Sequence, residues 1–153
     1  MQTTTLKNLN LKHAKKEDLP LITDILIKES LPASDIILDI IQIYLFYDND
    51  QLVGITGLEN FSKFGLLRSV AVVENYKGKG FGKTMCNLTM EKAVELGVEE
   101  LYLLTTTAEK FFVSIGFESI DRNLAPGFIR STTEFKNLCP ASASFMKKNL
   151  DVI

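Results

Sequence analysis

The sequence predicts an α+β protein with a mixed, mostly antiparallel central sheet of about six to seven strands, flanked by helices. Residues 41–47 and 52–58 are rich in β-forming residues, and the turn sequence Asp48-Asn49-Asp50 between them predicts an antiparallel hairpin. The strand-like segment 64–73 leads through a glycine-rich loop into a helical segment, and the next strand follows at 101–104. Because a crossover helix joins parallel strands, the predicted sheet contains one parallel pair.

The remaining elements follow from apolar periodicity and from residues that end helices. Alternation predicts a strand over 9–13, and helical spacing over 19–26 predicts a helix that ends before Leu31-Pro32. A second short helix is predicted over 33–40, with Ser34 or Asp35 near its start. Later elements are, in order, a helix from the glycine-rich loop to Gly97, a short helix that contains Phe111 and ends at Gly116, a strand over 117–120, a helical turn over 128–130 and a final strand over 142–146.

The composition is that of one globular domain over residues 1–153, in which we expect 1–6 to be flexible. A net charge of −2 argues against a nucleic-acid partner, and no apolar run reaches the length of a membrane-spanning helix. Cys86 and Cys139 are expected to be free thiols. Because no export signal is recognised at the N-terminus, we expect a cytoplasmic protein without a membrane partner.

The most informative segment is the glycine-rich loop Lys77-Gly78-Lys79-Gly80-Phe81-Gly82-Lys83, which lies between a strand and a helix. A helix N-terminus attracts anions, and glycines let a phosphate approach the main chain. The alternative is a flexible turn with solvated lysines. The loop lacks the Gly-Lys-Ser/Thr ending of a nucleotide P-loop, and the preceding hairpins disfavour a dinucleotide-binding fold. The segment therefore predicts a site for a phosphate-bearing ligand.

Two motifs in this order resemble the GCN5-related N-acetyltransferase (GNAT) superfamily over about residues 64–120. The family signature Arg/Gln-x-x-Gly-x-Gly/Ala is similar to the loop, with Lys77 at the first position, and Val70-Ala71-Val72 is similar to its Leu-Ala-Val strand end. The segment 108–117, Ala-Glu-Lys-Phe-Phe-Val-Ser-Ile-Gly-Phe, resembles the later hallmark Ala-x-x-Phe-Tyr-x-x-x-Gly-Phe. The resemblance implies the GNAT fold, in which two central strands splay apart to admit acetyl-coenzyme A (acetyl-CoA).

The same resemblance implies how acetyl-CoA binds. Backbone amides from Lys79 to Lys83 would hold the pyrophosphate, the pantetheine would lie along the strand at residues 70–72, and the amide of Val72 would polarise the thioester carbonyl. No metal is implied, and the protein is expected to be a monomer or a homodimer. The implied cofactor-binding residues are Val70, Ala71, Val72, Lys77, Gly78, Lys79, Gly80, Phe81, Gly82, Lys83, Phe111 and Phe112.

The chain departs from the family pattern at the general acid. Many members have a tyrosine where this chain has Phe112, and a phenyl ring donates no proton. Water, Ser114 or another group would take the role, or the thiolate would leave unassisted. Glu59 and Glu134 are possible general bases.

Candidates for acceptor binding are two arginines and the loop at Leu31 and Pro32. Arg68 lies in an otherwise apolar strand and Arg130 in a late loop, so either could clamp an anionic group, or form a structural ion pair. Leu31-Pro32 could close over the substrate or be a plain helix connection. Segments 66–72, 103–109, 128–132 and 138–143 resemble the arsenic-resistance N-acetyltransferase subgroup. This resemblance suggests Cys139 as a site for arsenic.

These observations predict an acetyl-CoA-dependent N-acetyltransferase that acts on the primary amine of a small, anionic, amino-acid-like molecule, an arsenical or another toxic analogue. Two alternatives remain open. One is a non-catalytic acyl-CoA-binding module or sensor, which Phe112 favours, and the other is a protein or peptide N-acetyltransferase.

Overall fold

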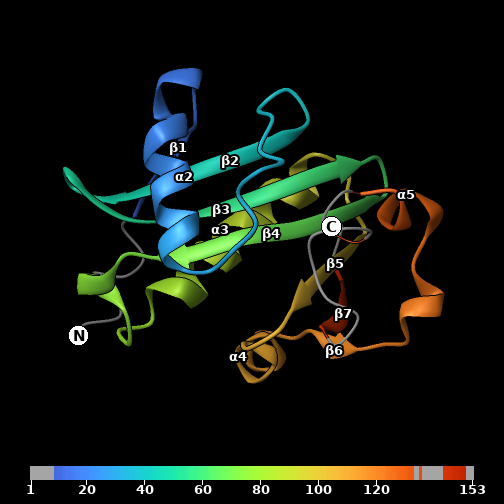
Figure 1. Cartoon of the computed structure of the whole chain (residues 1–153). Helices are drawn as coiled ribbons and strands as arrows, with labels where there is room; N and C mark the ends of the chain where they lie inside the picture. Colours follow the sequence, from blue (N-terminus) through green and yellow to red (C-terminus); the bar gives the residue numbers. More distant parts are fainter. Residues whose placement is uncertain (1–8, 133–134, 136–142, 151–153) are drawn as a thin grey trace.

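A computed structural model of the chain describes residues 9–132, 135 and 143–150, and the predicted flexible segment 1–6 lies outside them. Seven strands form one open sheet in the order β1-β2-β3-β4-β5-β7-β6, with helices packed on its faces (Figure 1). The strands are β1 (Asn10–His13), β2 (Ile41–Asp48), β3 (Gln51–Phe61), β4 (Phe64–Val72), β5 (Glu100–Thr105), β6 (Glu118–Ser119) and β7 (Ser144–Asn149). The helices are α2 (Leu19–Lys28), α3 (Phe81–Glu95), α4 (Glu109–Ser114) and α5 (Gly127–Arg130), with 3₁₀ turns η1 (Lys16–Asp18), η2 (Glu74–Tyr76) and η3 (Arg122–Leu124).

The sheet is mixed, as predicted. Strands β4 and β5 pair in parallel, and every other pair of neighbours in this sheet is antiparallel. The parallel pairing extends only from Phe64–Leu66 on β4 to Glu100–Tyr102 on β5, although β4 continues to Val72 and β5 to Thr105. The two strands therefore separate beyond Leu66, which confirms the predicted splay.

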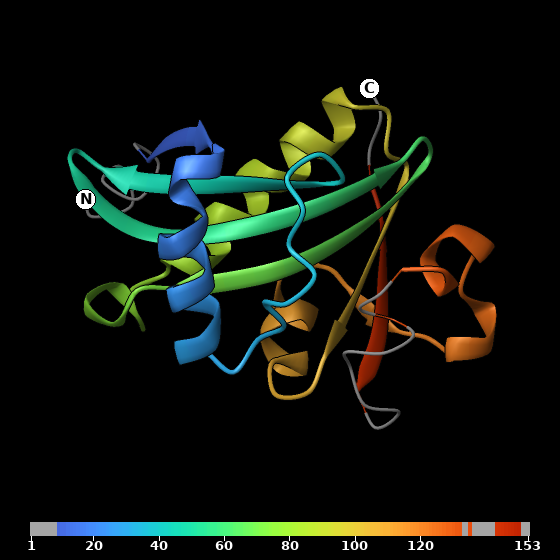
Figure 2. The ribbon, with the colours of Figure 1, turned by 45° about the horizontal axis from the view of Figure 1, so that its top comes forward.

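Helices cover both faces of the sheet, and Figure 2 shows α2 in front of the strands and α3 behind them. The inner side of α3 packs into the largest apolar cluster, together with Phe112 of α4. On the other face, α2 packs with strand residues Ile41, Ile43, Leu45, Ile55 and Ala71. Because these faces bury alternate residues of the same strands, β4 has apolar neighbours on both sides and its backbone is held firmly in place.

The predicted helix over residues 33–40 is wrong, since this segment is a chain of turns. Leu31, Ala33, Ile36 and Leu38 pack against the α2 cluster, and Asp35 forms an ion pair with the sheet. Tertiary contacts therefore override the weak helical pattern. The final strand also runs later than predicted, at Ser144–Asn149, and the strand predicted over 117–120 is reduced to Glu118–Ser119.

Within the described residues, no helix is both long and apolar enough to cross a membrane.

Candidate active site

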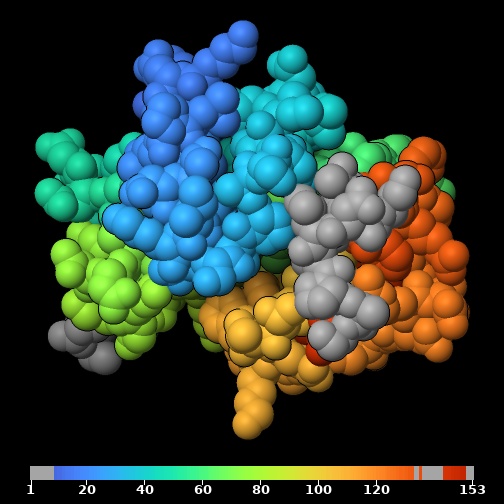
Figure 3. Space-filling model, in the orientation of Figure 1, coloured from blue at the N-terminus to red at the C-terminus, as the bar shows by residue number. Residues whose placement is uncertain are grey.

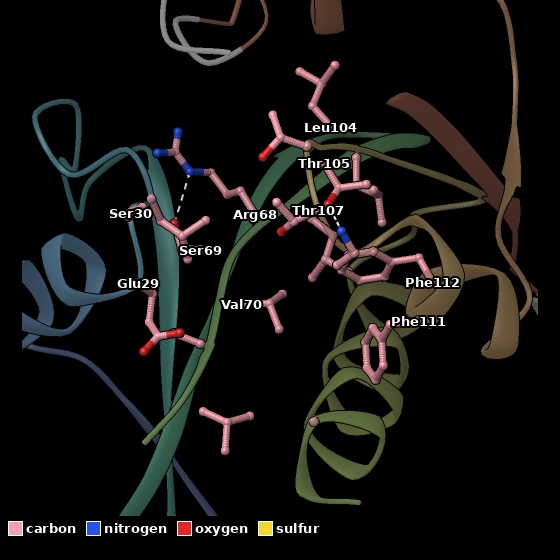
Figure 4. A pocket seen from close by; sticks show the side chains of 18 of the residues that line it. Glu29, Ser30, Arg68, Ser69, Val70, Leu104, Thr105, Thr107, Phe111 and Phe112 are labelled. Carbon is pink, nitrogen blue, oxygen red and sulfur yellow. Dashed lines mark hydrogen bonds between the residues drawn. The ribbon is translucent and has the colours of Figure 1, made fainter. Parts of the chain in front are cut away.

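The space between the separated strands is a cavity of about 400 Å³. Its walls come from β4, from the end of β5 and the following Thr106-Thr107-Ala108, from α4 and from the segment after α2 (Figure 4). Figure 3 shows a narrow hollow on this face, between residues 31–40 and the region of α4. The lining residues are Glu29, Ser30, Leu31, Pro32, Leu67, Arg68, Ser69, Val70, Ala71, Val72, Lys77, Gly82, Leu103, Leu104, Thr105, Thr106, Thr107, Ala108, Phe111 and Phe112.

A bulge in β4 shapes one wall of this cavity. Ser69 has a φ of +58°, and the register with β3 shifts between Ile55 and Gly57 at this point. A Cβ on Gly57 would lie 3.2 Å from the Arg68 carbonyl oxygen, so a side chain opposite the bulge would require its neighbours to shift by a few tenths of an ångström. Because β5 has already moved away, the cavity-facing main chain of β4 over residues 70–72 is open to a ligand that pairs like a strand.

The glycine-rich loop leads directly into α3. Gly78 and Gly80 have φ of +74° and +87°, and Gly80 is the N-cap of the helix. The Thr84 N–H donates to the Gly80 carbonyl at 3.4 Å, which leaves the preceding first-turn amides without an intrahelical acceptor. Phe81 is turned into the core against Tyr76, with ring centroids 5.1 Å apart. The loop thus has the geometry of an anion site formed by main-chain amides.

Lys77 and Gly82 are the two loop residues that line the cavity. The Lys77 Nζ lies 2.8 Å from a Glu29 carboxylate oxygen and 3.4 Å from one of Glu74. The hydrogen bond to Glu29 raises the pKa of Lys77, which keeps the ammonium charged. The other predicted loop residues do not line the cavity, although they are neighbours of Lys77 and Gly82 in the sequence. They are Gly78, Lys79, Gly80, Phe81 and Lys83.

Helix α4 places two phenyl rings against the cavity. Phe112 is 7% exposed and packs edge-on to Phe111 and Phe117, with centroids 5.1 Å and 5.8 Å away. Ser114 donates to the Phe111 carbonyl at 2.5 Å and is not a lining residue. No tyrosine, histidine or cysteine is among the residues that line this cavity. A side-chain general acid of the tyrosine type is therefore missing from the described cavity wall.

Arg68 is buried in a network of charged groups. Its Nη1 and Nη2 atoms donate to the two Asp35 carboxylate oxygens at 2.5 Å and 2.6 Å, and Nη1 also donates to Glu59 at 2.9 Å. Its Nε donates to the Ser69 hydroxyl at 3.2 Å, which connects the network to the bulge (Figure 4). The structural ion pair considered for Arg68 is thus present, and the residue also lines the cavity.

Glu59 lies behind Arg68 and does not line the cavity. Burial raises the pKa of its carboxyl group, while the hydrogen bond and charge of Arg68 oppose this shift. A buried carboxylate next to an arginine is held in place by that partner. Any proton exchange with a ligand would have to pass through Arg68 or water, because the Glu59 side chain is only 6% exposed.

The structure brings only some of the predicted acceptor residues together. Arg68, Leu31 and Pro32 line the cavity, whereas Arg130 does not. The Arg130 guanidinium donates to the carbonyl oxygens of Ala125 and Asn123 at 3.1 Å and 2.6 Å. Glu134 and Cys139 lie outside the described residues, and within the part that is described no three His, Cys, Asp or Glu side chains gather as a metal site.

Sequence reasoning missed several cavity residues. Glu29 and Ser30 follow α2, Thr105 ends β5, and Thr106 and Thr107 come after it. Asp35, which holds Arg68 from outside the lining, was missed as well. The threonine run was visible in the sequence, and the Thr105 hydroxyl accepts from the Ala108 N–H at 3.0 Å, which orients the start of α4. No local pattern marks Asp35 as the partner of a residue 33 positions away.

Comparisons with known proteins agree with this geometry. The family described as acetyltransferase (GNAT) matches residues 17–117, which is more than half of the chain. The chain therefore belongs to the GNAT acetyltransferase family.

Solved structures share the fold. An N-acetylglutamate synthase from Neisseria gonorrhoeae, in complex with coenzyme A and L-arginine, matches 93% of this chain with a TM-score of 0.76 and 19% identity. The match covers 33% of the synthase, so this chain spans about a third of it. Rv2747 from Mycobacterium tuberculosis, in complex with CoA, is 21% identical with a TM-score of 0.74 over 93% of this chain and 99% of that one. Tetrahymena GCN5 is 15% identical, with a TM-score of 0.74 over 95% of this chain and 98% of that one.

Proposed function

We propose that this protein is an acetyl-CoA-dependent N-acetyltransferase that acts on the primary amine of a small, anionic, amino-acid-like molecule. The observation that carries the proposal is the joining of three features in one cavity. The main chain of β4 is open beside its bulge, the first-turn amides of α3 have no intrahelical acceptor, and α4 closes the opposite side. Together they fit a ligand with a pyrophosphate at one end and a pantetheine-like chain along the strand.

In this reaction the amine nitrogen attacks the acetyl carbonyl carbon, a C–N bond forms, and the C–S bond breaks to release the coenzyme A thiolate. The amide of Val72 stabilises the negative charge that develops on the carbonyl oxygen. We propose that the attacking amine loses its proton to water, since Glu29 is the one carboxylate among the described lining residues and it is paired with Lys77. The thiolate leaves without a side-chain acid, because a thiol of pKa about 8.5 is a competent leaving group near neutral pH.

The cavity also limits the acceptor. Ser30, Leu31 and Pro32 close one side, so the remaining room suits a compact molecule better than a folded protein segment. Arg68 is the cationic residue on the acceptor side, which supports an anionic acceptor, and the resemblance to the arsenic-resistance subgroup supports an arsenical or another toxic analogue.

The test measures release of coenzyme A thiol with a panel of amines that includes common amino acids, phosphorus- and arsenic-containing amino acids, and short peptides. We expect turnover with at least one small amino-acid-like amine and none with peptides. Turnover of peptides alone would contradict the proposed acceptor class. Failure to bind acetyl-CoA in calorimetry would contradict the proposal as a whole.

A second candidate is a non-catalytic acyl-CoA sensor, which the phenyl ring of Phe112 favours. Such a protein would bind acetyl-CoA and release no thiol with any amine. Phe112→Tyr separates the two functions, with Phe111→Tyr as the matched control on the neighbouring ring. In an enzyme, a well-placed hydroxyl is expected to raise kcat by roughly threefold to tenfold, well below the full effect of a general acid, since the wild type already turns over without one. In a sensor, neither variant releases coenzyme A thiol with any amine.

A further inference from the structure

Asp35 occupies the end of Arg68 that an acceptor carboxylate would use. Both terminal nitrogens of the guanidinium donate to Asp35, one to each oxygen, which is the bidentate arrangement that arginine makes with free carboxylates. The Arg68 side chain is 0% exposed. An anionic ligand therefore has no open face of Arg68 to bind while Asp35 is in place.

Asp35 and Glu59, the described carboxylates on Arg68, are held very differently. Glu59 belongs to β3, where it is in register with Ile41 on one side and Leu66 on the other, so it cannot move without disturbing the sheet. Asp35 lies in the turns of residues 31–40 and its side chain is 12% exposed. Within the described chain, no backbone hydrogen bond joins residues 32–36 to a strand or a helix. Asp35 is thus the partner that can leave.

The same segment forms part of the cavity wall. Leu31 and Pro32 line the cavity four and three residues before Asp35, next to Ser30 at the end of α2. In Figure 4 the Arg68 guanidinium lies on the side of Ser30, away from Phe111 and Phe112. Movement of Asp35 away from Arg68 would also move this wall and enlarge the acceptor side.

We propose that Asp35 is a specificity-determining residue, which stands in for the acceptor carboxylate and is displaced by it when the acceptor binds. This inference rests on the proposed function, because it assumes that the acceptor enters beside Arg68. The exchange replaces one carboxylate by another on the same guanidinium, so the buried charges stay paired. An amine without a carboxylate gains nothing from displacing Asp35. The apparent affinity for an anionic acceptor equals the intrinsic affinity multiplied by the fraction of molecules in which Asp35 has left Arg68.

The test compares wild type with Asp35→Asn, using L-leucine and 3-methylbutylamine, which is the same molecule without its carboxylate. Calorimetry on the CoA-loaded protein gives Kd for each probe, and thiol release gives KM where turnover occurs. If about one molecule in ten has Asp35 displaced, Asp35→Asn tightens L-leucine binding about tenfold. Binding of 3-methylbutylamine stays within twofold.

Two further variants act as controls. Asp35→Glu keeps the carboxylate and is expected to retain the weak binding of L-leucine, and Asp39→Asn removes an exposed carboxylate from the same segment without effect. Asp35→Asn also lowers the melting temperature, so titrations are made well below it. If Asp35→Asn does not fold, Asp35→Ser replaces it in the same titrations.

The outcomes separate the two proposals. Tighter binding of L-leucine without turnover of any amine supports the exchange and contradicts the N-acetyltransferase. Weaker binding of both probes, or a fall in kcat at unchanged Kd, means that Asp35 only positions Arg68 and overturns the exchange. Equal or undetectable binding of L-leucine to wild type and variant overturns it as well.

Discussion

The donor side and the acceptor side of the cavity are built in different ways. On the proposed donor side, the cavity wall is main chain: the bulged edge of β4 and the first turn of α3. On the proposed acceptor side, the wall is formed by side chains from separate parts of the sequence, with Arg68 of β4 paired to Asp35 and Glu59. Main-chain geometry follows from a few local residues, whereas a charged network depends on which distant residues the fold brings together. The two sides therefore differ in how they respond to substitution.

The two arginines that the sequence suggested for the acceptor give the largest expected contrast. Arg68→Met leaves Asp35 and Glu59 as buried carboxylates that have lost a cationic partner, and we expect the free energy of unfolding to fall by about 3–5 kcal/mol. Arg130→Met removes hydrogen bonds to two carbonyl oxygens near the surface and is expected to cost about 1 kcal/mol. Urea unfolding of both variants measures the difference. Similar losses would mean that the network around Arg68 contributes no more to the free energy of unfolding than the hydrogen bonds of Arg130.

A glycine pair tests the donor side. Gly80 and Gly97 stand at the two ends of α3 with φ of +87° and +92°, so alanine is strained at both, by about 1 kcal/mol. Only Gly80→Ala is expected also to weaken acetyl-CoA binding, by about tenfold, because relief of the strain turns the first-turn amides away from the pyrophosphate. Calorimetry with acetyl-CoA, together with thermal unfolding, distinguishes the effects. If Gly97→Ala weakens binding equally, the loss comes from helix stability and the amide site is contradicted.

The effect that is smallest near neutral pH concerns the support of α3. Burial raises the pKa of the Cys86 thiol to about 12. Between about pH 9 and pH 12 the unfolded chain releases this proton while the folded protein keeps it, so stability falls as the pH rises, by about 1.4 kcal/mol per pH unit. Cys86→Ala has no proton to release, so the stability advantage of wild type over this variant should shrink above about pH 9. Urea unfolding at pH 8 and about pH 10 measures the change, and a pH-independent difference would mean that water reaches the inner face of α3.

The donor side could be predicted closely because its signals are local. The loop from Lys77 to Lys83, the strand before it and the helix after it led to the GNAT family, and the family match and the splayed strands confirm that part. The sequence also placed Phe112 in the position of the usual tyrosine, and the structure places its ring at the cavity wall. Which atoms bind acetyl-CoA remains a prediction.

The acceptor side was less predictable from the sequence. The helix predicted over 33–40 is wrong, and for Arg68 and Arg130 the sequence left open whether either binds an anionic group or forms a structural ion pair. The structure separates them, since Arg68 is buried beside Asp35 while Arg130 lies outside the cavity lining. Nothing near Asp35 in the sequence indicates that its partner is Arg68.

The sequence by itself determined the class of fold, the order of strands along the chain and the place of the proposed anion site, because glycine positions, strand patterns and a helix start act over a few residues. Only the tertiary structure decided which charged side chains meet. Burial makes an unpaired charge costly, so the folded chain selects partners from distant segments, and here Asp35 and Glu59 converge on Arg68. If the acceptor binds beside Arg68 as proposed, its selection depends on contacts that exist only after folding.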